Sequence, residues 1–135
     1  AGRALLNLGH TFAHVIEPLA QLSPDNNPAH APLHHGEAVA LGLVAAAAAA
    51  HAIDPTPGTK AHAERLGALL TALQLPTVVA DLPESSALAA AMLHDKKPRA
   101  GRLRIVLPHP AATASPLNDP PESALLAGWD AIRLS

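Results

Sequence analysis

The run of six alanines from Ala45 to Ala50 constrains the fold more than any other feature of this sequence. Alanine has the highest helix propensity of all residues, so the run predicts a helix, which we place at residues 37–53. Glu37 suits the beginning of that helix because a carboxylate interacts favourably with the helix dipole there. Asp54-Pro55 ends it. Because alanine side chains are small, we expect this run to form a close helix–helix contact.

The overall composition also favours packed helices. Hydrophobic residues make up 49% of the 135 residues, but aromatic residues only 1%. The interior is therefore built from Leu, Val, Ile and Ala, whose modest size lets helix axes approach. One hydrophobic core is expected for a chain of this length. We predict a mainly α, multihelical fold with at most a short β element.

Hydrophobic spacing and helix-breaking residues predict the remaining elements. Pro18 is expected to kink or end the first predicted helix. The helix at residues 59–75 is amphipathic, with four leucines expected to face the core: Leu66, Leu69, Leu70 and Leu73. The other helices are predicted at residues 4–21, 85–94 and 122–134, one strand at residues 103–107, and a loop at residues 108–121.

Charge and cysteine content exclude several classes of protein. The net charge of −2 provides no basic surface for nucleic acid and no polybasic patch for a membrane. No cysteine is present, which excludes disulfides and thiolate metal sites and leaves nine histidines as candidate metal ligands. The longest apolar run, residues 38–50, is shorter than a membrane span requires. We therefore expect neither nucleic acid nor a membrane as a partner.

Histidines are concentrated in two blocks of the sequence. His10 and His14 are four residues apart, so in a helix they project from the same face. His35 stands at the beginning of the alanine-rich helix, and an imidazole from this second element could complete most of a metal site. Taken alone, His10 and His14 could equally be structural histidines of an amphipathic helix, and His35 a loop residue.

These blocks carry a resemblance to a known family. The segments R-A-L-L-N-L-G-H-T-F-A-H-V-I-E and L-H-H-G-E-A-V-A-L-G, followed by D-K-K at residues 95–97, occur in the order found in the C-terminal domain of 3-dehydroquinate synthase. The resemblance covers roughly residues 3–107. It implies a multihelical domain of a metal- and NAD-dependent enzyme of the shikimate pathway. That enzyme converts 3-deoxy-arabino-heptulosonate 7-phosphate, a phosphorylated sugar acid, to 3-dehydroquinate and phosphate.

The resemblance assigns the histidines to roles. It implies that His10 and His35 are ligands of Zn²⁺ or Co²⁺, and that a glutamate from a preceding region is the third ligand. It makes His14 a catalytic residue that contacts substrate and moves protons, although geometry alone also allows His14 to chelate beside His10. Glu17 and Glu37 are either carboxylates that orient the ligand imidazoles or solvated helix residues.

The resemblance also assigns the charged and amide side chains to the substrate. Arg3 and Asn7 would bind its anionic groups, as a guanidinium fork and an amide suit such oxygens. One lysine of the D-K-K run would reach the substrate. We assign Lys96 as the catalytic residue and Lys97 as substrate-binding. Outside this family such a run is usually a solvated charge cluster.

The sequence contains no glycine-rich strand–turn–helix segment that could hold a dinucleotide phosphate. We therefore expect residues 1–135 to be a single helical domain, the C-terminal part of a longer two-domain enzyme. An N-terminal nucleotide-binding domain would then bind NAD. The full-length enzyme is expected to be a cytoplasmic homodimer, and the isolated chain inactive. Two alternatives stay open: a related sugar-phosphate cyclase such as 2-deoxy-scyllo-inosose synthase, or a non-catalytic helical interaction domain.

Overall fold

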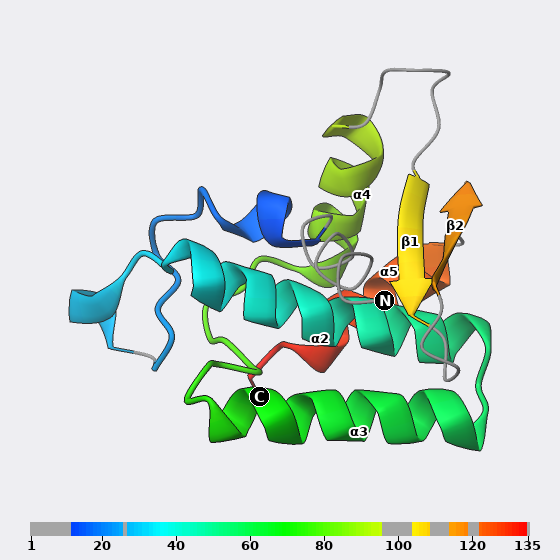
Figure 1. The fold of residues 1–135 in the computed structure, drawn as a ribbon. Coiled ribbons are helices and arrows are strands. Elements are labelled where there is room, and N and C mark those ends of the chain that lie inside the picture. Colours follow the sequence, from blue (N-terminus) through cyan, green and yellow to red (C-terminus); the bar gives the residue numbers. More distant parts are fainter. Residues whose placement is uncertain (1–11, 26, 96–103, 109–113, 119–121, 135) are drawn as a thin grey trace.

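The computed structural model describes residues 12–25, 27–95, 104–108, 114–118 and 122–134. Helices dominate this part of the chain, which confirms the predicted mainly α class (Figure 1). The elements in order are the 3-10 helix η1 (Pro28–His30), helices α2 (His35–Ile53), α3 (Pro57–Ala72) and α4 (Ser85–Asp95), strands β1 (Arg104–Pro108) and β2 (Ala114–Asn118), and helix α5 (Glu122–Ala131).

Helix α2 is the central element, as its alanine content predicts. It packs against α5, α3 and β1, and α3 runs back antiparallel beside it (Figure 1). A Cβ atom added to Gly128 of α5 would lie 2.8 Å from the backbone oxygen of Ala45, so the two helix backbones nearly touch. The expected close helix–helix contact is confirmed.

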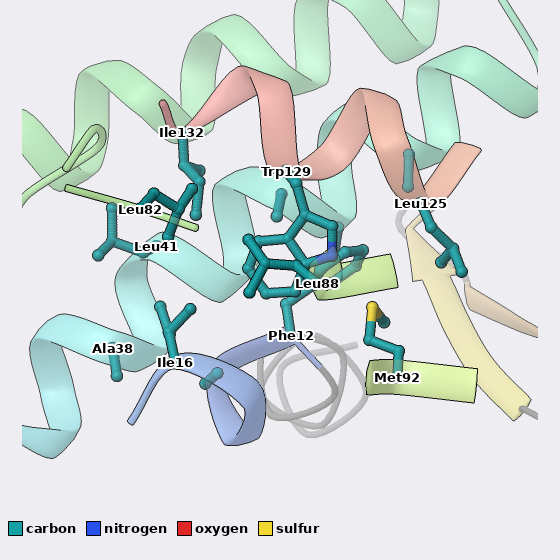
Figure 2. Close-up of a cluster of buried hydrophobic side chains, with 14 of the residues drawn as sticks. Phe12, Ile16, Ala38, Leu41, Leu82, Leu88, Met92, Leu125, Trp129 and Ile132 are labelled. Carbon is teal, nitrogen blue, oxygen red and sulfur yellow. The ribbon is translucent and has the colours of Figure 1, made fainter. Parts of the chain in front are cut away.

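The main hydrophobic core joins residues from both ends of the chain (Figure 2). Phe12 and Trp129 are fully buried and meet edge to face, with ring centroids 5.1 Å apart. Other core residues come from the helical segment at residues 12–16, from α2, α4 and α5, and from the connection before α4; they include Ile16, Leu41, Leu82, Leu88, Met92, Leu125 and Ile132. This core holds the N-terminal segment against α5.

Helix α3 packs on the opposite side of α2 through a smaller cluster. Leu66 and Leu70 are buried there against Ala40 and Ala47 of α2. The sequence expectation was wrong for Leu69 and Leu73, which are 56% and 60% exposed. The four leucines form one stripe, but Leu69 lies at its edge and Leu73 follows the last residue of α3, so α2 covers only Leu66 and Leu70.

An arginine links the C-terminal segment to the connection before α4. The guanidinium of Arg133 donates hydrogen bonds to the backbone oxygens of Leu82 and Pro83, at 2.9 and 2.6 Å, and to Ser85 Oγ at 2.9 Å. The Ser85 hydroxyl in turn donates to the Asp130 carboxylate. These bonds hold the beginning of α4 beside the end of α5.

The β element is a two-stranded antiparallel hairpin in which Val106 pairs with Pro116. The predicted strand at residues 103–107 is confirmed as β1. The expectation of a loop throughout residues 108–121 was wrong, because β2 forms within it. Pairing with β1 supplies the backbone hydrogen bonds that compensate for the weak strand propensity of A-S-P-L-N.

Two further expectations concern helix length. Helical backbone occupies residues 12–16 and ends before Pro18, which confirms the expected effect of this proline, whereas the predicted extension of the helix to residue 21 was wrong. Residues 4–11 of that predicted helix lie outside the described residues. Helix α2, at 19 residues with a mean hydropathy of 1.6 over the tested window, is long and apolar enough to cross a membrane by length and composition. Over that stretch 56% of the residues are buried inside the protein, as in a core helix.

Candidate functional site

Two of the seven predicted site residues, His14 and His35, belong to the described part of the chain. Each lies in one of the two histidine blocks. The other five lie outside the described residues, so their predicted positions stay predictions: Arg3, Asn7, His10, Lys96 and Lys97.

The short helix at residues 12–16 presents His14 away from the core. Phe12, Ala13 and Ile16 are buried, whereas His14 is exposed. The Glu17 backbone N–H donates to the Ala13 oxygen at 2.9 Å, which continues the helical pattern by one bond. Glu17 follows His14 by three residues and is partly buried, so its side chain lies between His14 and the buried face of the segment.

Helix α2 begins at His35, the second candidate ligand. The carboxylate oxygen Oε1 of Glu37 accepts a hydrogen bond from the backbone N–H of His34 at 2.7 Å. This bond satisfies one of the backbone donors that every helix leaves unpaired at its N-terminus. Glu37 therefore fixes where α2 begins and, with it, the position of the His35 backbone.

The imidazole of His35 meets the carboxylate of Glu17. Its Nδ1 atom lies 3.0 Å from Glu17 Oε2, and these side chains are 60% and 36% exposed. The contact brings together the two histidine blocks that the sequence shows as separate segments. Of the two carboxylates considered as orienting groups, Glu17 touches the imidazole of His35, and Glu37 caps the helix backbone.

The loop between the two blocks has a structure of its own. His30 Nδ1 lies 2.7 Å from Asp25 Oδ2, and Asn27 Oδ1 accepts from the Ala29 N–H at 3.0 Å to cap η1. The hydrogen bond from His30 lowers the pKa of Asp25 below its usual value. The loop and the first turn of α2 together border an open pocket of about 360 Å³, lined by Pro24, Ala29, His30, Ala31, Pro32, His34 and Glu37.

His51 and His62 lie outside the two histidine blocks. His51 Nδ1 lies 2.7 Å from Thr59 Oγ1, where it links the end of α2 to the beginning of α3. Two effects lower the pKa of His62: burial, which is the larger, and the positive charge of Arg65. No group of three or more possible metal ligands lies together within the described ranges.

Comparison of the sequence with known proteins identifies its family. The sequence model described as "3-dehydroquinate synthase C-terminal" matches residues 1–98. The chain therefore belongs to the 3-dehydroquinate synthase family, through its C-terminal domain.

Its relatives carry the same name. The chain is 42% identical to a protein named 3-dehydroquinate synthase from Xylella fastidiosa strain 9a5c, across 91% of this chain and 30% of that protein. It is 43% identical to one from Xanthomonas axonopodis pv. citri strain 306, across 92% and 32%. The chain thus spans about a third of the length of these relatives.

Proposed function

We propose that this chain is the helical, metal-binding part of a 3-dehydroquinate synthase, a lyase of the shikimate pathway and so of aromatic amino acid biosynthesis. The enzyme would convert 3-deoxy-arabino-heptulosonate 7-phosphate to 3-dehydroquinate and phosphate. The observation that carries the proposal is the 3.0 Å contact between His35 and Glu17, because it unites the two histidine blocks of the family. The family match and the names of the relatives support it.

The metal ligands in this proposal are His10 and His35. The residues fit such a role, since imidazole is a common ligand of Zn²⁺ and Co²⁺, and a carboxylate hydrogen-bonded to a ligand imidazole is the usual supporting partner. Catalytic sites of this kind use three protein ligands and one open position. The third ligand would come from the preceding part of the protein. The bound metal supplies Lewis acidity to a substrate oxygen.

Substrate handling is assigned to residues near the same segment. His14 is exposed on the helical turn that precedes Glu17, and imidazole is suited to proton transfer near neutral pH. Arg3, Asn7 and Lys97 would bind the carboxylate and phosphate of the substrate, and Lys96 would act beside His14. Cationic side chains around one anionic substrate neutralise its charge and orient it.

The proposal also concerns the rest of the protein. Residues 1–135 would form one domain that follows an N-terminal nucleotide-binding domain, and that domain would hold the NAD that carries the hydride. The full-length protein would be a cytoplasmic homodimer. Because the cofactor site and the third metal ligand lie elsewhere, this chain alone would be inactive.

The test is a comparison of variants in the full-length protein. Purified enzyme with NAD and Zn²⁺ or Co²⁺ should release phosphate and 3-dehydroquinate from the heptulosonate phosphate. His10→Ala and His35→Ala should each abolish turnover and lower metal content measured by atomic emission. His30→Ala, which removes a loop imidazole paired with Asp25, is the matched control and should keep wild-type metal content.

Three outcomes would contradict the proposal. Turnover of a different sugar phosphate in place of the heptulosonate would indicate a related cyclase, such as a 2-deoxy-scyllo-inosose synthase. Absence of any turnover or metal binding in the full-length protein would indicate a non-catalytic helical domain. Wild-type metal content in both His10→Ala and His35→Ala would exclude these histidines as ligands.

A further inference from the structure

The contact between Glu17 and His35 has a direction that determines the chemistry of the imidazole. An ionised carboxylate can only accept hydrogen bonds. The Nδ1 atom, 3.0 Å from Glu17 Oε2, therefore carries the hydrogen. In a neutral imidazole with Nδ1–H, the lone pair that can bind a metal belongs to Nε2.

We propose that Glu17 is a positioning residue that holds His35 in the Nδ1–H tautomer and makes Nε2 the metal-binding atom. This inference rests on the proposed function, which makes His35 a metal ligand. It adds a residue that would act on the metal only through that ligand. A carboxylate partner of this kind sets the orientation of the ring and raises the basicity of its ligating nitrogen.

The two side chains come from different segments, and the contact joins them. The His35 side chain is 60% exposed, so packing against neighbours limits its rotation only in part. It is also the first residue of α2, where fewer helix neighbours surround it than in the helix interior. Glu17 belongs to a different segment, whose buried residues anchor it to the core. Its carboxylate therefore gives the His35 ring a hydrogen-bond partner on a segment that is fixed to the core.

Glu37 provides a matched control within the same region. It is also a glutamate and lies two residues from His35, but its Oε1 accepts from the His34 backbone at 2.7 Å. Glutamine can make the same cap, so Glu37→Gln should leave the beginning of α2 intact. The comparison separates loss of a nearby negative charge from loss of the Nδ1 partner.

The experiment measures metal affinity in the full-length protein, by competition between the apo-protein and a chromophoric chelator for Zn²⁺. Glu17→Ala should weaken Zn²⁺ binding by about 10- to 100-fold, the range typical for loss of such a partner. The Zn²⁺ affinity of Glu17→Gln should lie between those of Glu17→Ala and the wild type. The glutamine amide oxygen still accepts a hydrogen bond but carries no charge. Glu37→Gln should bind as the wild type does. The visible spectrum of the Co²⁺ form should change for Glu17→Ala and stay unchanged for Glu37→Gln.

A second measurement reads the tautomer directly. The apo-protein is labelled with ¹⁵N-histidine and studied by NMR at about pH 8.5, two units above the ordinary imidazole pKa of about 6.5. The ¹⁵N chemical shifts of His35 should show the hydrogen on Nδ1. The signals are assigned with His35→Gln. Glu17→Gln, the milder variant, keeps this measurement possible if Glu17→Ala does not fold.

The outcomes distinguish this inference from the proposed function. If His35→Ala abolishes Zn²⁺ binding while Glu17→Ala keeps wild-type affinity and the wild-type Co²⁺ spectrum, the positioning role is wrong and the ligand assignment stands. If His35→Ala binds Zn²⁺ normally, the ligand assignment itself is wrong. An Nε2–H tautomer in the wild-type apo-protein would also overturn the inference.

Discussion

Phe12 and Trp129, the chain's single phenylalanine and single tryptophan, pack against each other from opposite ends of the sequence. Their rings are inclined by 73° with centroids 5.1 Å apart, the edge-to-face arrangement that aromatic quadrupoles favour. Phe12 lies in the helical segment at residues 12–16 that carries His14. The contact therefore links the orientation of a candidate site residue to the last helix of the chain (Figure 2).

This pair predicts an energetic coupling between the two ends of the chain. In a double-mutant cycle of Phe12→Leu and Trp129→Leu, the interaction energy should be about 0.5–1.5 kcal/mol, the usual value for aromatic pairs beyond their burial. Trp129→Ala alone should cost about 3–5 kcal/mol of unfolding free energy because it leaves a large cavity. Urea unfolding provides both values. Strictly additive single mutants would show that the rings contribute only by burial.

The close approach of α2 and α5 predicts opposite effects for two glycine substitutions. A Cβ at Gly128 would lie 2.8 Å from the Ala45 oxygen and 3.0 Å from ring carbons of Phe12, whereas a Cβ at Gly67 in α3 meets nothing within 4 Å. Gly128→Ala should destabilise by about 1–3 kcal/mol through overpacking. Gly67→Ala should stabilise by about 0.5–1 kcal/mol because alanine is the better helix former. Thermal unfolding distinguishes them, and a neutral Gly128→Ala would show that the helices separate easily.

The arginine that joins the C-terminal segment to the connection before α4 predicts a specific requirement for a guanidinium. Arg133→Lys keeps the charge but cannot donate to the oxygens of Leu82 and Pro83 together in the same planar geometry. The loss should be about 1–3 kcal/mol of unfolding free energy, as expected for buried acceptors left with fewer donors. Arg65→Lys on the exposed side of α3 is the control and should change little. Equal denaturant midpoints for both variants would contradict this prediction.

The lowered pKa of His62 predicts that the protein becomes less stable as the pH falls. Burial and the charge of Arg65 lower its pKa in the folded state, so the unfolded chain binds a proton more readily. The contribution of His62 to the unfolding free energy should therefore be complete above about pH 6.5, the ordinary imidazole pKa, and should be lost as the pH falls below that value. His62→Gln should flatten this dependence. Arg65→Gln should reduce it in part. Identical pH profiles for wild type and His62→Gln would exclude His62 as the cause.

The D-K-K run predicts a division between its two lysines in the full-length enzyme. Lys96→Ala should lower kcat, and Lys97→Ala should raise KM for the heptulosonate phosphate, because the first is assigned to chemistry and the second to substrate binding. Metal content should be normal in both. Steady-state kinetics provide the comparison. Wild-type kinetics for both variants would indicate a solvated charge cluster.

The fold was predictable wherever one local property dominated. The alanines of α2 have a strong intrinsic preference for helix, so the helix and a close helix–helix contact were predicted correctly, whereas α5 as the partner was not predicted. Strand β2 was not predictable, because A-S-P-L-N has a proline and no β-branched residue, and β1 alone stabilises it as a strand. Leu69 and Leu73 were misplaced because periodicity cannot say how much of an apolar stripe the neighbouring helix covers.

The candidate site was predictable as a set of residue types and less so as a set of contacts. The two histidine blocks were evident from sequence, and so were two carboxylates that could orient an imidazole. Only the tertiary structure selects Glu17 for His35 and Glu37 for the helix cap, because that choice depends on how the loop between the blocks brings their ends together. The roles assigned to Arg3, Asn7, His10, Lys96 and Lys97 remain predictions.

The alanine faces of α2 also determine which mutations can alter the site from a distance. Buried alanines lie on two sides of this helix, since Ala45 and Ala46 belong to one core cluster and Ala47 to the other. Ala45 lies about ten residues, or about 15 Å, along the helix from His35. A larger side chain at Ala45 would rotate or shift helix α2 and so change the orientation of the His35 imidazole at its beginning. Selection for altered metal preference should therefore yield substitutions at small residues deep in the helix interface as well as beside the ligands.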